Sequence, residues 1–157
     1  MREIERIVET YSDTLLRLAM HHVNNLAEAQ DVVQDVYLKY MKKHPAFNDF
    51  EHEKAWLMRV CITRCKDYHR HWWQLKRSEA PNEIKDEDHS NDFVLLDEVK
   101  KLNFHERNAI YLYYYEQYSV KEIASIFETK ENTVSSWLHR ARKQLKEQLK
   151  GGWDDEE

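Results

Sequence analysis

The stretch ENTVSSWLHRARKQL, residues 131–145, carries side chains that could bind duplex DNA. Its apolar residues recur at helical spacing and predict an inner face made of Val134, Leu138, Ala141 and Leu145. Short polar side chains that can reach base edges, and basic side chains that can hold phosphates, are left for the outer face. These candidate duplex-binding residues are Asn132, Thr133, Ser136, His139, Arg140, Arg142 and Lys143.

A second helix is predicted directly before this one. In SVKEIASIF, residues 119–127, the spacing predicts one apolar stripe made of Val120, Ile123, Ala124 and Phe127. Ala124 is small enough to let the following helix cross closely. Two such helices joined by a short turn predict a helix-turn-helix, whose second helix can enter the major groove.

Positive charge is concentrated in two segments of an acidic chain. The 157 residues contain 24 Lys and Arg against 29 Asp and Glu, a net charge of -5, which excludes a uniformly basic nucleic-acid binder. Residues 54–77 carry seven positive side chains and one acid, Asp67, for a net +6. Residues 130–150 carry six positive side chains and two acids, for a net +4. Nucleic-acid binding is therefore predicted from these two local surfaces.

Other chemistry has weaker support in the sequence. A metal or redox site could be formed by Cys61, Cys65 and His69, which follow one another at four-residue steps. Against this, a single helical stripe presents its ligands in a line, and no fourth ligand is evident. Packing is the favoured role of the two cysteines. The only glycines, Gly151 and Gly152, cannot form a Gly-rich phosphate loop, and no nucleophile with its base can be assembled. We expect no enzymatic activity, no cofactor and no metal.

The elements that must position these residues are predicted to be helices throughout. Two glycines and two prolines leave few hairpin turns, so the fold class is all-α. We expect one or two helices up to Val23, a helix capped by Asn24 or Asn25, an ordered loop over 44–51 and a basic helix from Lys54.

This pattern predicts two small helical domains. They are expected at 1–77 and 93–150, joined by a flexible acidic linker at 78–92 and followed by an acidic tail at 151–157. No apolar run approaches membrane-spanning length, so a cytoplasmic protein is expected.

Several segments, taken in order, resemble those of extracytoplasmic-function sigma factors, the small bacterial class that directs RNA polymerase to promoters. In the first predicted domain the resemblance is carried by AEAQDVVQDVYLKY at 27–40 and by WLMRVCITRCKDYHR at 56–70. In the second it is carried by Leu102, Arg107, Glu122-Ile123-Ala124, Thr133-Val134 and Arg140-Ala141-Arg142. The ordered set covers nearly the whole chain and is more specific than a helix-turn-helix alone.

The resemblance implies partners and further site residues. It implies binding to RNA polymerase core through Asp31, Gln34, Asp35 and Lys39. It implies that a flipped base and the displaced strand of a promoter element are held by Phe47, Asn48, Phe50, Arg59, Arg64, Lys66 and Arg70. Burial as loop anchors is an equally good interpretation of the two phenylalanines. Implied partners are RNA polymerase core, promoter DNA and, as for many similar proteins, an anti-sigma factor.

The turn of the predicted helix-turn-helix departs from the family pattern. Glu128 stands where similar proteins usually have Gly, and a left-handed residue there would cost about 1 kcal/mol. Lys130 replaces the usual capping Ser, so Thr129 is predicted to take over the cap. Ser135 and Trp137 replace basic residues, which predicts fewer phosphate contacts.

Other functions stay open from the sequence. An autonomous helix-turn-helix regulator would bind an operator by itself, as a dimer, although no effector pocket or dimer stripe is apparent. A metal-responsive binding protein would contain metal after purification. The exposed charges of both domains also fit ordinary solvated helix faces.

Overall fold

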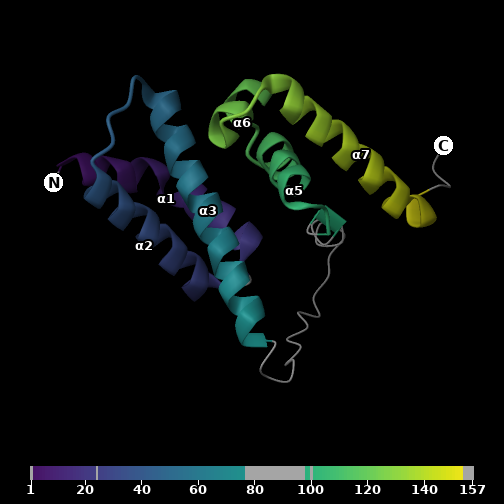
Figure 1. The fold of residues 1–157 in the computed structure, drawn as a ribbon, viewed down its shortest axis with the longest axis horizontal. Helices are drawn as coiled ribbons and strands as arrows, with labels where there is room; N and C mark the ends of the chain where they lie inside the picture. Colours follow the sequence, from purple (N-terminus) through teal and green to yellow (C-terminus); the bar gives the residue numbers. More distant parts are fainter. Residues whose placement is uncertain (1, 24, 77–97, 100, 154–157) are drawn as a thin grey trace. The chain divides into compact units, whose positions relative to one another are not determined.

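The structure, a computed structural model, describes residues 2–23, 25–76, 98–99 and 101–153 (Figure 1). The chain divides into two compact units, Met1–Asn82 and Glu83–Glu157. Every regular element within the described ranges is helical, which confirms the predicted all-α class. The linker predicted at 78–92, the capping candidate Asn24 and residues 154–157 of the predicted tail lie outside the described residues. None of the helices described is long and apolar enough to cross a membrane.

The first unit contains three helices, α1 (Arg2–His22), α2 (Leu26–Lys43) and α3 (Phe50–Lys76), each of which packs against the other two (Figure 1). The first segment is a single helix of 21 residues. Its apolar stripe and those of α2 and α3 meet in a core whose fully buried members include Leu15, Leu18, Val36, Leu57 and Met58. Burial of these stripes fixes which faces of α2 and α3 are left outside.

Short polar side chains set the starts of α2 and α3. Asn25 caps α2, as predicted, because its side chain accepts a hydrogen bond of 2.8 Å from the N–H three residues ahead. The side chain of Asp49 accepts a hydrogen bond of 2.8 Å from the N–H of His52, and α3 therefore begins at Phe50. The ordered loop predicted over 44–51 was two residues too long, because an Asp cap starts the helix earlier.

The second unit contains α5 (Phe104–Ile110), the π-helix η1 (Tyr111–Tyr115), α6 (Val120–Phe127) and α7 (Glu131–Trp153). Its core forms where α7 crosses α5 and α6, and its buried members include Val99, Leu112, Ile123, Ile126 and Leu138. The π-helix continues directly from α5 and was not predicted, because one widened turn leaves no clear trace in the spacing of apolar residues.

Helices α6 and α7 form the predicted helix-turn-helix (Figure 1). A capping box begins α6, in which Ser119 and Glu122 exchange two hydrogen bonds of 3.0 Å. Glu128 ends α6 in the left-handed conformation, with φ 52°. The next residue, Thr129, donates its N–H to the carbonyl of Ala124 at 2.9 Å, which completes a Schellman motif.

Two predictions about this motif need correction. Lys130, and not Thr129, holds the N-cap position of α7, because the helix begins at Glu131 and the carbonyl of Lys130 accepts the N–H of Val134 at 3.3 Å. The buried stripe of α6 also includes Ile126, which the sequence did not indicate, whereas Phe127 is only half-buried. The short helix is covered from two sides, so its buried face is wider than one stripe.

Candidate nucleic-acid interface

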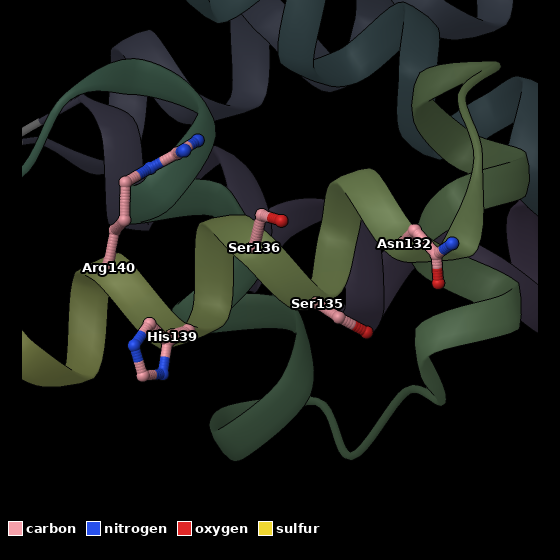
Figure 2. A pocket seen from close by; sticks show the side chains of 5 residues that line it. All are labelled: Asn132, Ser135, Ser136, His139 and Arg140. Atoms are coloured by element: carbon pink, nitrogen blue, oxygen red, sulfur yellow. The ribbon is translucent and has the colours of Figure 1, made fainter.

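The outward face of α7 collects part of the predicted duplex-binding set. At about 100° per residue, four of its members fall within about 60° of one another, opposite the buried face, and all four are exposed: Asn132, Ser136, His139 and Lys143. We call these four residues the outer stripe. Three of them line an open depression together with Ser135 and Arg140 (Figure 2). The outer stripe is therefore a continuous polar surface on a single helix.

The other three predicted residues stand at the edges of the outer stripe. Arg140 turns toward α5 and away from His139 (Figure 2), and its Nε lies 3.3 Å from Oε1 of Glu106. On the opposite edge, Arg142 donates from Nε to the Tyr114 hydroxyl at 2.6 Å, and its guanidinium lies over that ring. Thr133 is half-buried. The two arginines thus have partners within the unit, which set where their remaining donors can reach.

An aromatic cluster orients α7 and explains why Trp137 replaces a basic residue. Trp137 stacks on His105 with 4.6 Å between ring centroids and meets Phe127 edge-on at 5.4 Å. Phe104 also contacts Phe127 at 6.5 Å. Such aromatic pairs contribute about 0.5–1.5 kcal/mol each beyond their buried area. Because the rings come from α5, α6 and α7, the cluster fixes the direction in which the outer stripe faces.

The outward face of α2 carries the four residues that the resemblance assigns to polymerase. Asp31, Gln34 and Lys39 are exposed, and Asp35 is half-buried. Leu38 lies on the same face with 54% of its surface exposed, and the sequence-based prediction omitted it. An apolar side chain surrounded by polar groups is typical of the centre of a protein-binding surface. The helical register could have revealed it, because Leu38 falls off the buried stripe of α2.

The basic residues of α3 do not share one face. Arg59 and Lys66 lie about 20° apart around the helix, whereas Arg64 lies about 140° or more from both. Arg64 instead reaches α2, where its terminal nitrogen lies 3.3 Å from Oδ2 of Asp35. The side chain of Arg70 lies outside the described residues. The predicted strand-binding set is thus divided between two faces, and one member contacts the predicted polymerase-binding set.

The two phenylalanines near the loop have different environments. Phe47 is half-buried and packs against Tyr40 and Trp56, with centroid distances of 6.4 and 5.9 Å. It therefore anchors the loop. Phe50 is 72% exposed at the first position of α3, and Asn48 is exposed between the two. An unpaired base can reach Phe50 and Asn48 more readily than Phe47.

A charged network beside Phe50 ties α1 to α3. Arg6 donates two hydrogen bonds to the carboxylate of Glu53, at 2.9 and 2.6 Å, and the hydroxyl of Tyr11 donates a third at 2.9 Å. The guanidinium of Arg6 also lies 5.6 Å from the ring centroid of Phe50. Sequence reasoning missed this network. A signal was available, because Glu53 lies four residues before buried Leu57 on the same face of α3, and an acid on an apolar stripe needs a partner.

The network shifts the pKa values of its members. Hydrogen bonds from Arg6 hold the pKa of Glu53 below its ordinary value, against burial, which acts in the opposite direction. Burial, followed by the hydrogen bond to Glu53, raises the pKa of Tyr11 to about 12. Glu53 is only 5% exposed and stays ionised because Arg6 is present.

The two cysteines are buried free thiols. The Sγ of Cys61 donates to the carbonyl of Leu15 at 3.7 Å, and a hydrogen bond with Cys65 together with burial raises the pKa of the Cys61 thiol. The side chain of His69 lies outside the described residues. No group of three or more side chains that could hold a metal occurs among the residues that the structure describes. The described geometry agrees with a packing role for both thiols.

An exposed polar stripe on the second helix of a helix-turn-helix is typical of DNA-binding transcription proteins. Two family models identify the particular family within this class. The model described as Sigma-70 region 2 matches residues 7–74, and the model described as Sigma-70, region 4 matches residues 93–145. The chain belongs to the sigma-70 family of RNA polymerase sigma factors.

Whole-chain relatives narrow this assignment. The chain is 30% identical over 156 residues to the RNA polymerase sigma-E factor of Streptomyces coelicolor, covering 94% of this chain and 86% of the relative. It is 26% identical to the ECF RNA polymerase sigma factor SigM of Bacillus subtilis, covering 98% of this chain and 99% of the relative. These matches confirm the predicted extracytoplasmic-function class, whose members are transcription initiation factors.

Solved structures share the fold. The sigma factor RpoE of Bartonella quintana, in complex with the anti-sigma factor NepR, superposes with a TM-score of 0.69 at 20% identity, covering 96% of this chain and 98% of RpoE. CnrH, in complex with the cytosolic domain of CnrY, gives a TM-score of 0.71 at 20% identity, covering 96% of this chain and 90% of CnrH. The likeness extends through both units of the fold.

Proposed function

We propose that the two units of this sigma factor divide the work of promoter recognition. The outward face of α2 binds RNA polymerase core, with Leu38 as an apolar anchor among Asp31, Gln34, Asp35 and Lys39. The exposed ring of Phe50, with Asn48 beside it, stacks on an unpaired base of a promoter element, which offsets the few kcal/mol needed to unstack it. The outer stripe of α7, with Arg140 at its edge, contacts duplex DNA farther upstream.

The observation that carries this proposal is the position of the two family matches. Region 2 matches residues within the first unit and region 4 matches residues within the second. Each unit has its own core and exposes its own polar surface, so each can bind a different part of a promoter complex. The acidic segment 78–92 is the proposed tether between them.

The charge balance supports cooperation with polymerase. Net charges of +6 and +4 are confined to residues 54–77 and 130–150 of a chain whose net charge is -5. Nonspecific affinity for DNA rises with the number of phosphates that are neutralised, so neither surface is expected to hold a promoter firmly by itself. An anti-sigma protein is a further proposed partner, because RpoE of Bartonella quintana was solved with one.

The test is transcription from a defined mixture. The purified chain is mixed with core polymerase and its own genomic DNA, and transcript starts are mapped. Discrete starts that depend on the chain are expected. Binding of the chain to an operator with no effect on polymerase would instead support the autonomous regulator.

Two variants separate the proposed surfaces. Asp35→Ala is expected to weaken polymerase binding, whereas Arg140→Ala is expected to lower promoter-dependent transcription and leave polymerase binding unchanged. Arg64→Ala is the matched control, because it breaks the same ion pair as Asp35→Ala but keeps the carboxylate on α2. Parental behaviour of both Asp35→Ala and Arg140→Ala would refute the residue assignments.

A further inference from the structure

Glu106 is an acid in the buried layer of the second unit. It lies on α5, only 7% of its side chain is exposed, and its backbone N–H donates to the side chain of Asn103 at 2.9 Å. Burying a carboxylate is unfavourable unless it is hydrogen-bonded or paired with a cation. The cation here is Arg140 of α7, whose Nε lies 3.3 Å from Oε1 of Glu106.

The two partners differ in exposure, and the difference indicates a role. Arg140 keeps 59% of its side chain exposed and lines the depression beside Ser136 and His139 (Figure 2). Glu106 accepts from Nε, which leaves the two terminal amino groups of the guanidinium, with four N–H donors, for another acceptor. Buried Glu106 therefore holds the Nε side of the exposed Arg140 guanidinium and leaves its terminal amino groups for another partner.

We propose that Glu106 is a positioning residue for DNA recognition, which fixes the guanidinium of Arg140 so that its terminal nitrogens meet a base edge in the duplex. This inference rests on the proposed function of α7. The forked pair of donors matches the two acceptors on the major-groove edge of guanine. An arginine already held by a second group loses less side-chain freedom on binding than a free one.

Two physical effects of Glu106 on DNA binding have opposite signs. Its negative charge repels phosphates, so neutralising it would strengthen binding to any DNA if charge were its only contribution. Its hydrogen bond orients Arg140, so removing that bond would weaken binding to the correct sequence if positioning dominates. The ratio of affinities for a specific and a scrambled duplex therefore separates the two effects.

The experiment uses the full chain assembled with core polymerase. The probes are a promoter fragment defined by transcript mapping and the same fragment with its upstream element scrambled. Glu106→Gln is expected to lower the affinity ratio about fivefold to tenfold, the lower part of the range for one bidentate base contact. Binding to the scrambled fragment is expected to stay constant or to rise.

Controls test whether the effect passes through Arg140. Adding Glu106→Gln to Arg140→Ala is expected to change the ratio less than twofold beyond Arg140→Ala alone, because the positioned group is already absent. Glu147→Gln makes the same charge change at an exposed position of α7 and is expected to leave the ratio unchanged. Glu106→Asp keeps the charge but shortens the side chain, so it is also expected to lower the affinity ratio. This variant keeps the inference testable if Glu106→Gln does not fold.

The outcomes distinguish this inference from the function on which it rests. If the parent yields no discrete transcript starts, the proposed function fails before any variant is compared. A second outcome is that the parent protein discriminates between the two fragments. If both Glu106→Gln and Glu106→Asp then discriminate as well as the parent, the positioning role of Glu106 is refuted. Additive losses in the double variant would also overturn it, because Glu106 would then act independently of Arg140.

Discussion

Removing Arg6 is expected to destabilise the first unit more than neutralising Glu53, although the two residues belong to one ion pair. Glu53 is 5% exposed and accepts three hydrogen bonds, two from Arg6 and one from Tyr11. Arg6 keeps 41% of its side chain exposed. After loss of its partner Arg6 can regain water, whereas Glu53 cannot.

The magnitudes follow from this asymmetry. Glu53→Gln keeps the shape and one acceptor and leaves Arg6 to be solvated, so the expected loss is about 2 kcal/mol, after allowance for solvent screening of the pair. Arg6→Met keeps the apolar part of the side chain but leaves a buried carboxylate with only Tyr11. The expected loss is about 3 kcal/mol at neutral pH, and the double variant is expected to recover part of it.

The pH dependence is expected to change sign between the parent and Arg6→Met. In the parent the pKa of Glu53 is lowered, so its contribution is present above the unfolded value of about 4.3 and is lost as the pH falls through the lower folded value. Without Arg6, burial outweighs the hydrogen bond from Tyr11 and raises the pKa of Glu53. Acidification from pH 7 toward pH 5 is then expected to restore stability.

Amide hydrogen exchange of the full chain measures these effects. Peptides from α1 and α3 report the first unit, and peptides from α6 and α7 in the same sample are the internal control. Protection is compared after correction for the intrinsic pH dependence of exchange. Equal losses in Arg6→Met and Glu53→Gln, or a loss of protection on acidification of Arg6→Met, would refute the reasoning.

Three further predictions follow from the described geometry. Glu128→Gly is expected to stabilise the second unit by about 1 kcal/mol, because φ is positive at Glu128. Slower amide exchange in α6 peptides would show this stabilisation, and faster exchange would contradict the prediction. Phe47→Ala is expected to destabilise the first unit by about 2 kcal/mol, whereas Phe50→Ala is expected to change its stability by less than about 0.5 kcal/mol. Phe50→Ala is expected instead to slow promoter opening, which permanganate footprinting measures. The reverse pattern would contradict the assignment of Phe50 as the base-binding ring. Leu38→Ala is expected to lower polymerase affinity about tenfold in a pull-down titration, while Leu26→Ala, a similarly exposed leucine on another face of α2, leaves it unchanged.

Much of the fold could be predicted because its determinants are local. The apolar spacing that marks α2 and the inner face of α7 depends only on residues three and four positions apart. The cap at Asn25 is equally local. Asp49 carried the same signal at the start of α3, but Pro45 together with the neighbouring Asn and Asp residues favoured a loop. The π-helix η1 could not be predicted, because the widened turn depends on how it packs against its neighbours.

The sequence indicates the candidate surfaces more directly than it indicates which residues share a face. The net charges of α3 and α7 indicated where a polyanion could bind, but the rotation of each helix decides which positive groups share a face. Arg64 illustrates this, because it faces Asp35 and not Lys66. The Arg140–Glu106 pair joins residues 34 positions apart, and no local pattern indicates such a contact.

The length of the outer stripe limits how many bases it can read. From Asn132 to Lys143 the helix advances by eleven residues, or about 16 Å at 1.5 Å per residue. Stacked base pairs are about 3.4 Å apart along the duplex axis. A straight helix lying in the groove can therefore touch at most about five consecutive base pairs, and any longer upstream motif must be sensed through DNA shape or through other parts of the initiation complex.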